Sequence, residues 1–256
     1  MLSDTELMRV QEVSSNSTKP VKLVLFGTGG QSSIERQIFD VARQLSGVSM
    51  NRILMEEAAE PVIPGKPSMT ITDGEDRRIH YLASPQGAEF APFLDAMAWI
   101  GAQSASQDEP KSRPLDEFGF PVNLIVLIAS SCPHCPHTVR SALALATRNN
   151  LVSVSIVDAL EFQDLAEKYK CRSTPTTIIN EGLTIVGNIG VDELAAKVIE
   201  SASQTSITAI VESMVKTGRA EDAAELVCLK HRPGALVDVF KQKEFSTRIG
   251  ALVAME

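Results

Sequence analysis

The apolar residues of this chain follow two different periods along its 256 residues. Short apolar runs bounded by Gly, Pro, Asn or Asp predict strands, and apolar residues three or four positions apart predict helices. After an amphipathic helix at 1–13, residues 20–101 are predicted to contain strand 21–26, helix 32–45, strands 52–55, 68–72 and 78–82, and helix 88–100. Residues 121–201 are predicted to contain strand 122–129, helix 133–149, strand 152–157, helix 162–170, strands 176–180 and 183–186, and helix 191–201.

These two stretches predict an internal repeat of α/β units. The first copy is degenerate, because no convincing helix precedes its hairpin across Asp73-Gly74. The second copy has a helix at that place, and its hairpin is expected to turn across Glu181-Gly182. Residues 102–120 between the copies are rich in Gln, Ser, Asp and Pro, which is typical of a linker.

From residue 206 to 256 the pattern is entirely helical. Four short amphipathic helices are expected at 207–216, 221–230, 234–243 and 246–256. Helices this short need neighbours to bury their apolar faces. The last one stops inside an apolar face, which leaves two interpretations open: a truncated helical repeat, or a helical surface that a partner protein completes.

Composition narrows the classes of function. The net charge of −8 argues against binding to nucleic acid or to an anionic membrane surface. No apolar run is long enough to predict a membrane span, and the first residues do not resemble a secretory signal. Four cysteines in a chain of this length do not form a disulfide framework, so the cytoplasm is the expected compartment. A mature exported form would have the same features.

The most informative motif is Cys132-Pro133-His134-Cys135, which lies between a predicted strand and a predicted helix. The unpaired N–H groups and the positive dipole end of a helix N-terminus favour a thiolate and lower its pKa. The second cysteine, one turn further along, can attack a mixed disulfide formed by the first. The spacing therefore predicts thiol–disulfide chemistry.

Zinc sites use the same C-x-x-C spacing, so a metal site and an incidental cysteine pair are the alternatives. A zinc site needs two further ligands, and no second C-x-x-C is present. Cys171 and Cys228 stand alone, the first expected as a small buried filler and the second as a core residue. We therefore expect no metal and no cofactor.

A glycine-rich turn at Gly27-x-Gly29-Gly30 follows the first predicted strand. It could indicate a dinucleotide-binding loop. The third glycine of that motif would fall on Ser32, so we interpret the turn as the remnant of a lost redox turn.

The second unit resembles a thioredoxin-fold domain. Two groups with tandem thioredoxin folds are similar to the whole repeat: the glutaredoxin-like protein disulfide oxidoreductases, and the N-terminal domain of the flavoprotein reductase that serves alkyl hydroperoxide peroxidase. The resemblance covers about residues 20–200. The motifs that carry it are Ser131–Pro136 and Ser173–Thr176 in the second unit, and Lys66–Thr72 and Gly87–Phe90 in the first.

The resemblance implies roles for the residues of the second unit. Cys132 would be the attacking thiolate and Cys135 the resolving thiol, with Pro133 and His134 between them. A hydrogen bond or positive charge from His134 should further stabilise the Cys132 thiolate. His137 is expected to be a solvated helix residue.

The resemblance also implies a substrate-binding loop. Thr174 and Pro175 would face Cys132, with a cis bond between them, and would offer backbone groups to an extended substrate segment. Pro67 would have the corresponding structural role in the first unit.

Two departures from these families qualify the resemblance. In the first unit, Ser32 and Glu35 are expected where the cysteines would stand, so that unit cannot carry out dithiol chemistry. In the second unit, Val126 replaces the buried carboxylate that thioredoxins keep six residues before the first cysteine. Proton removal from Cys135 would then need water or another group.

Together these features predict an α/β protein with two tandem thioredoxin-like folds followed by a short all-α segment. We expect a thiol–disulfide oxidoreductase that acts on protein disulfides, with a peroxiredoxin as one substrate and a separate flavoprotein reductase as electron donor. The alternative is a redox-sensing adaptor whose helices at 206–256 bind a helical partner.

Overall fold

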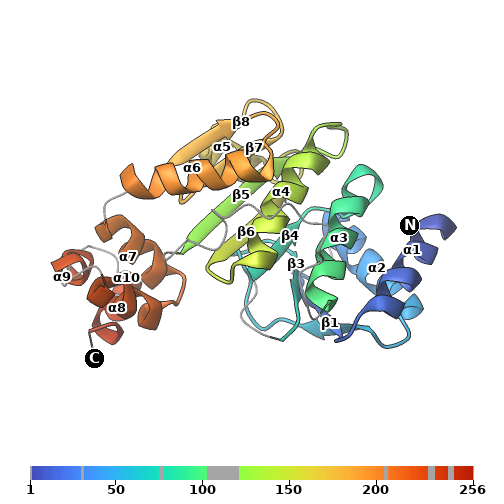
Figure 1. Ribbon diagram of the computed structural model, residues 1–256, viewed down its shortest axis with the longest axis horizontal. Helices are drawn as coiled ribbons and strands as arrows, with labels where there is room; N and C mark the ends of the chain where they lie inside the picture. The colour runs from blue at the N-terminus through green and yellow to red at the C-terminus, as the bar shows by residue number, and fades with distance from the viewer. Residues whose placement is uncertain are drawn as a thin grey trace.

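The computed structural model describes residues 2–29, 32–74, 78–102, 121–204, 207–229, 234–241 and 245–255. The first unit, with the N-terminal helix, consists of α1 (Asp4–Asn16), β1 (Val21–Phe26), α2 (Ser33–Val48), β2 (Ile53–Glu57), β3 (Ser68–Thr72), β4 (Arg78–Leu82), the 3-10 helix η1 (Gly87–Glu89) and α3 (Phe90–Gly101). The second unit consists of β5 (Val122–Ile128), α4 (Cys135–Arg148), β6 (Val152–Asp158), α5 (Gln163–Lys168), β7 (Thr176–Ile179), β8 (Leu183–Val186) and α6 (Val191–Gln204). The C-terminal helical unit consists of α7 (Ile207–Lys216), α8 (Ala220–Leu229), α9 (Gly234–Phe240) and α10 (Phe245–Val253) (Figure 1).

The two α/β units share one eight-stranded sheet in the order β2-β1-β3-β4-β6-β5-β7-β8. Within each unit the first two strands are parallel, and the last two form an antiparallel hairpin beside the first. The units join where β4 pairs with β6 in parallel, with Leu82 opposite Val157. The repeat predicted from the sequence is therefore built into a single continuous sheet.

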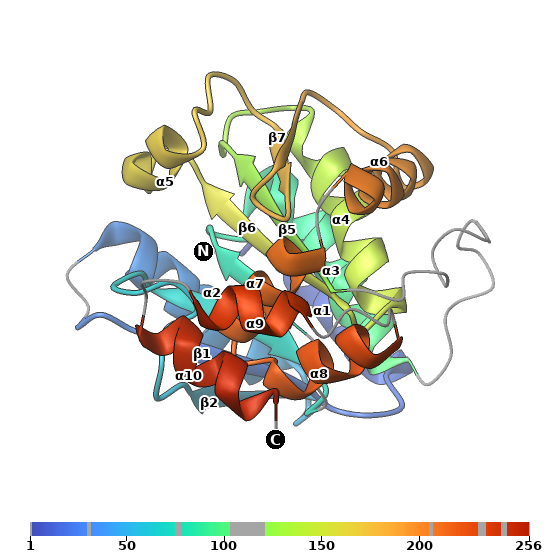
Figure 2. The same cartoon turned by 90° about the vertical axis from the view of Figure 1, so that its left-hand side faces the viewer.

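Helices α1, α3, α4 and α6 pack in a row across one face of the sheet. Helix α5 lies on the other side of the sheet from α6 (Figure 2). The first unit has no helix between β2 and β3, where the second unit has α5. This confirms that the first copy is degenerate. Within the described residues, no helix combines the length and the apolar character needed to cross a bilayer.

Apolar side chains form two separate cores. The larger one extends from Leu2 to Val198 and includes both units and Cys135. The smaller one lies inside the C-terminal helical unit, around Val211, Val215 and Val239. The all-helical segment expected from the sequence therefore has its own core.

A prediction follows for this smaller core, where α10 packs closely on α7 at Gly250. A Cβ atom at Gly250 would lie 2.5 Å from Val215 Cγ1 and 3.3 Å from the Val215 carbonyl oxygen. Because a β-branched side chain cannot easily rotate away, Gly250→Ala is expected to destabilise the helical unit by about 1–3 kcal/mol. Gly234→Ala on α9, where a Cβ meets nothing within 4 Å, is the matched control. Unfolding in denaturant, monitored by limited proteolysis, measures the stability of both variants. Equal stabilities would contradict the close packing at Gly250.

Two boundaries differ from expectation in ways that matter for the site. Helix α4 begins at Cys135 and not at Pro133, because residues before it form a turn in which the Cys132 N–H donates to the Ala129 carbonyl at 2.9 Å. The β7–β8 turn centres on Asn180 and Glu181, both with positive φ, and not on Glu181-Gly182. Residues 103–120, most of the predicted linker, lie outside the described residues.

Candidate redox site

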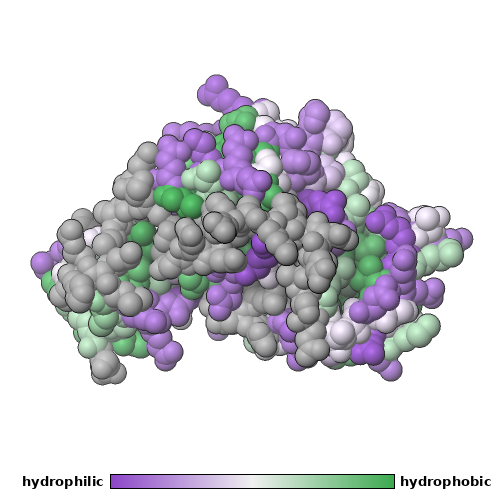
Figure 3. Space-filling view, in the orientation of Figure 1, coloured by the Kyte–Doolittle hydropathy of each residue, from purple (hydrophilic) through white to green (hydrophobic). Residues whose placement is uncertain are grey.

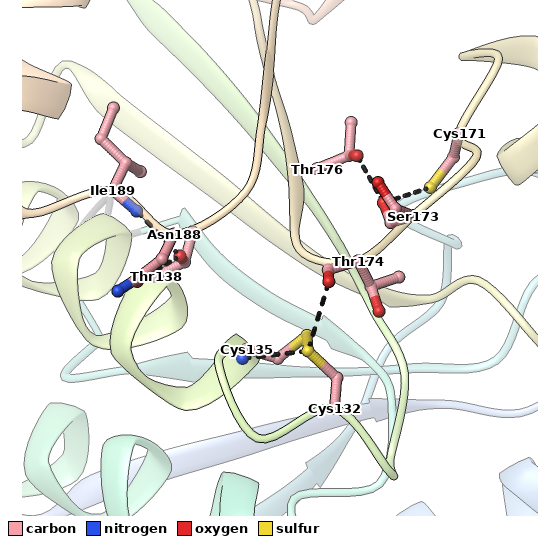
Figure 4. The surroundings of a disulfide bond; sticks show 9 residues. All are labelled: Cys132, Cys135, Thr138, Cys171, Ser173, Thr174, Thr176, Asn188 and Ile189. Carbon is pink, nitrogen blue, oxygen red and sulfur yellow. Dashed lines mark hydrogen bonds between the residues drawn. A yellow bond between two sulfur atoms is a disulfide. The ribbon is translucent and has the colours of Figure 1, made fainter.

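The turn that contains Cys132 and Cys135, called the redox turn below, lies at the carboxyl end of β5. The two cysteines are joined there by a disulfide with Cα atoms 5.5 Å apart (Figure 4). Cys135 is fully buried as the first residue of α4, whereas Cys132 retains 9% of its surface. The Cys135 N–H donates to Cys132 Sγ at 3.2 Å. In the reduced form, this N–H and the dipole of α4 would favour a thiolate on Cys132.

The loop before β7 faces this disulfide. The Thr174–Pro175 peptide bond is cis, as the resemblance implied, and the Thr174 carbonyl oxygen lies 3.4 Å from Cys132 Sγ (Figure 4). The Gly187 N–H donates to the Pro175 carbonyl at 2.8 Å and ties the loop to the end of β8. Pro67 precedes β3 as Pro175 precedes β7, but among the described residues only the Thr174–Pro175 bond is cis.

Hydrogen bonds also join the first turn of α4 to the segment after β8. The fully buried Thr138 donates from Oγ1 to Asn188 Oδ1 at 3.2 Å and accepts the Ile189 N–H at 3.2 Å (Figure 4). The redox turn, the cis-proline loop and the segment after β8 are therefore fixed to one another by hydrogen bonds.

The other residues of the motif lie at the surface. Pro133 and His134 are exposed, and His134 is the N-cap residue of α4 without a side-chain capping bond. His137 is exposed, as expected. The effect of His134 on the Cys132 thiolate therefore remains a proposal based on its chemistry.

The two remaining cysteines differ from expectation. Cys228 is exposed, so its predicted place in the core is wrong; the apolar period of α8 is met by Ala223, Leu226 and Val227 instead. Cys171 is half-buried, and its thiol donates to the Ser173 carbonyl at 3.3 Å. In the described part of the chain, no group of three or more His, Cys, Asp or Glu side chains could hold a metal ion.

Glu89 is a buried acid on the 3-10 helix η1 that the sequence reasoning missed. Only 3% of its surface is exposed, and neither carboxyl oxygen has a hydrogen-bond partner among the described residues. Burial, with a smaller contribution from the charge of Asp158, raises the pKa of Glu89 to about 7. Its 3-10 helix η1 packs against α4, which begins at Cys135. The available signal was a single acid between Ala88 and Phe90, at the start of a strongly apolar helix.

The corresponding end of the first unit contains no thiol. Ser32 caps α2 by accepting the Glu35 N–H at 3.2 Å, and the buried Glu35 accepts the Thr28 hydroxyl at 2.6 Å. Helix α2 begins at Ser33 and α4 at Cys135, so a count from the helix start places Ser33 opposite Cys135, whereas the count from the strand places Glu35 there. The first unit lacks the dithiol with either count.

Residues 122–200 match a family model described as a thioredoxin domain. With the repeated strand order of the sheet and the Cys132–Cys135 disulfide, this match shows a tandem thioredoxin-like fold and supports thiol–disulfide redox function for the second unit. The chain resembles the F subunit of alkyl hydroperoxide reductase from Pseudomonas putida, to which it is 22% identical over 203 residues. That alignment covers 79% of this chain and 38% of the relative, so the chain spans little more than a third of that protein.

One further relative and two solved structures are also similar to this chain. The F subunit of the Pseudomonas aeruginosa reductase is 22% identical over 173 residues, which cover 67% of this chain and 33% of that protein. The NTD_N/C domain of alkyl hydroperoxide reductase AhpF from Enterococcus faecalis superposes with a TM-score of 0.66 at 17% identity, covering 77% of this chain and 100% of that one. A protein disulfide oxidoreductase from Aeropyrum pernix superposes with a TM-score of 0.67 at 18% identity, covering 80% and 95%.

Proposed function

We propose that this chain is a protein-disulfide oxidoreductase in which Cys132 attacks and Cys135 resolves. The observation that supports it best is the asymmetry of the pair. Cys132 has the only remaining access to solvent and faces the Thr174 carbonyl, whereas Cys135 is fully buried behind it. An incoming disulfide can reach the first sulfur and not the second.

The proposed reaction has two exchanges. The Cys132 thiolate attacks one sulfur of the substrate disulfide, which forms a mixed disulfide and releases the other substrate sulfur as a thiolate. Cys135 then loses its proton and attacks Cys132 Sγ. This forms the Cys132–Cys135 disulfide and releases the second substrate thiolate. Two electrons pass from the protein dithiol to the substrate.

We propose Glu89 as the acceptor of the Cys135 proton. Val126 is fully buried and cannot take a proton, so the proton acceptor must be water or another group. Glu89 is buried without hydrogen-bond donors among the described residues, and its 3-10 helix packs on α4. A pKa of about 7 lets its carboxylate form accept a proton near neutral pH.

We propose a peroxiredoxin disulfide as the substrate, supported by the likeness to F subunits of alkyl hydroperoxide reductases. Each turnover leaves Cys132 and Cys135 oxidised, so electrons must come from a further dithiol. We propose a separate flavoprotein reductase as that donor and the reducing cytoplasm as the compartment.

Stopped-flow mixing tests the proposal. The protein is reduced, freed of reductant and mixed with an oxidised two-cysteine peroxiredoxin, and thiols on both are counted after rapid alkylation. We expect one peroxiredoxin disulfide reduced per Cys132–Cys135 disulfide formed, and re-reduction by a thioredoxin-reductase-type flavoenzyme. If the peroxiredoxin stays oxidised while a small aromatic disulfide is reduced, the proposed substrate is wrong, and the proposed thiol–disulfide exchange still stands.

A second candidate, a redox-sensing adaptor, is favoured by the outer surface of α9 and α10. Large apolar side chains are exposed there, namely Val237, Ile249, Leu252 and Val253. Figure 3 shows apolar side chains on the surface of this unit. The adaptor model predicts a helical partner whose affinity changes when the disulfide is reduced and is lost in Leu252→Glu. A partner affinity that does not depend on the redox state would exclude it.

A further inference from the structure

Thr138, on the first turn of α4, uses its hydroxyl group differently from the two other hydroxyl residues of that helix. A serine or threonine inside a helix commonly donates to the carbonyl four residues before it. Ser141 and Thr147 both do this, at 3.0 Å each. Thr138 instead donates to Asn188 Oδ1 at 3.2 Å and accepts the Ile189 N–H at 3.2 Å. Its hydroxyl group therefore joins α4 to the segment after β8 and not to its own helix.

The backbone of the segment after β8 depends on this hydroxyl group. Thr138 is fully buried, and Ile189 retains 2% of its surface. Among the described residues, the Ile189 N–H has the Thr138 hydroxyl as its one acceptor. The Asn188 side chain is exposed and can turn to water, but a buried N–H group without an acceptor is costly. Without the hydroxyl group, the segment would have to shift until the Ile189 N–H found another acceptor.

The same segment holds the cis-proline loop in place. It begins with Gly187, whose N–H donates to the Pro175 carbonyl at 2.8 Å. Gly187 has a φ of 100°, which side chains rarely allow, so this turn requires glycine. On the other side of the loop, the Thr174 carbonyl oxygen lies 3.4 Å from Cys132 Sγ. A path of hydrogen bonds and backbone therefore leads from Thr138 to the reactive sulfur, and Figure 4 shows both of its ends.

We propose that Thr138 is a positioning residue that holds the cis-proline loop where a protein disulfide can bind beside Cys132; this rests on the proposed function. In the first exchange, the electron pair of the Cys132 thiolate forms a bond to one substrate sulfur. The other substrate sulfur leaves as a thiolate with the electrons of the broken S–S bond. A protein disulfide must also place its backbone along Thr174 and Pro175, whereas a small disulfide needs only the accessible sulfur. A displaced loop therefore slows exchange with protein disulfides alone.

Thr138→Val in the full chain tests this, because valine keeps the shape of threonine and lacks the hydroxyl group. Ser141→Ala is the matched control, since it removes a buried hydroxyl group that bonds within α4. The first readout is the rate at which each reduced protein reduces an oxidised two-cysteine peroxiredoxin, insulin and the small aromatic disulfide dithiobis-nitrobenzoate. The second is the exchange of the Gly187 and Ile189 amide hydrogens, followed by NMR, which reports whether the segment after β8 has moved.

We expect Thr138→Val to slow the reduction of both protein disulfides by roughly 10- to 10²-fold, as for a small misplacement of a binding group. The rate with the small aromatic disulfide should not change. The Gly187 and Ile189 amide hydrogens should exchange faster than in the wild type. Thr138→Ser should restore both readouts, because it keeps the hydroxyl group, and Ser141→Ala should behave as the wild type does.

Equal slowing with protein and small disulfides would overturn the proposal, and so would no slowing with either kind. An unchanged exchange of the Gly187 amide hydrogen would also overturn it, because the loop would then not depend on Thr138. A wild type that reduces neither protein disulfide would instead overturn the proposed function itself. If Thr138→Val does not fold, Thr138→Ala also lacks the hydroxyl group and is tested in the same way.

Discussion

Replacing Cys132 by Ser is expected to reduce disulfide-exchange activity by roughly 10³-fold or more, because the redox turn then has no nucleophile that a substrate can reach. Cys135→Ser is expected to lose turnover for a different reason. Its Cys132 thiolate still attacks, but no thiol remains to resolve the mixed disulfide. Cys135→Ser should therefore accumulate a covalent complex with its substrate protein, and Cys132→Ser should not.

Non-reducing electrophoresis and intact mass measure both outcomes after incubation with an oxidised peroxiredoxin. Cys171→Ser and Cys228→Ser are the matched controls, since neither thiol lies in the disulfide. Both controls should keep full turnover. A covalent complex formed by Cys132→Ser through Cys135 would show that the order of attack is reversed, despite the complete burial of Cys135.

Glu89→Gln is expected to make the protein more stable and less active above neutral pH. In the folded protein the pKa of Glu89 rises from its ordinary value of 4.5 to about 7. Below about pH 4.5 the carboxyl is protonated in both the folded and the unfolded chain. Between these values only the folded chain keeps the proton, so the free energy of unfolding of the wild type falls as the pH rises. The loss reaches about 3 kcal/mol above pH 7, at ~1.4 kcal/mol per pKa unit.

The measurement is the difference in unfolding free energy between Glu89→Gln and the wild type across this pH range. It should be constant below about pH 4.5, rise in favour of the variant up to about pH 7 and then level off. Resolution of the mixed disulfide should be slower in the variant by roughly 10²-fold, as for loss of a general base. Glu167→Gln, at an exposed position of α5, provides the control. A pH-independent difference would show that Glu89 does not titrate as described.

The sequence was sufficient for most of the local structure. Strands β1 and β8 and the β3–β4 hairpin have the predicted bounds, because their apolar runs end at strong turn residues. The β7–β8 turn was displaced by one residue, because Asn180 and Glu181 both adopt the left-handed conformation. Similarly, Pro133 suggested a helix start that the Cys132 turn delays to Cys135.

What the sequence could not show depends on contacts between distant residues. The pairing of β4 with β6 joins the two units in one sheet, and no local pattern encodes which strand edges meet. The environment of Glu89 is equally non-local, because it is made by elements of both units. The C-x-x-C chemistry could be predicted because the two cysteines are close in sequence. The burial of Glu89 could not, because α4, against which its 3-10 helix packs, is far away in the chain.

The most direct test of the central claim is the reduction potential of Cys132–Cys135, measured by equilibration in glutathione buffers and alkylation of the free thiols. We expect a reversible two-electron transition confined to these two cysteines. We expect it near about −270 mV, as for thioredoxin, if the protein passes electrons to a peroxiredoxin in the cytoplasm. A value near about −120 mV would indicate an oxidase and contradict that direction of electron flow. A disulfide that stays intact below about −300 mV would be structural, and would contradict the redox function proposed for this turn.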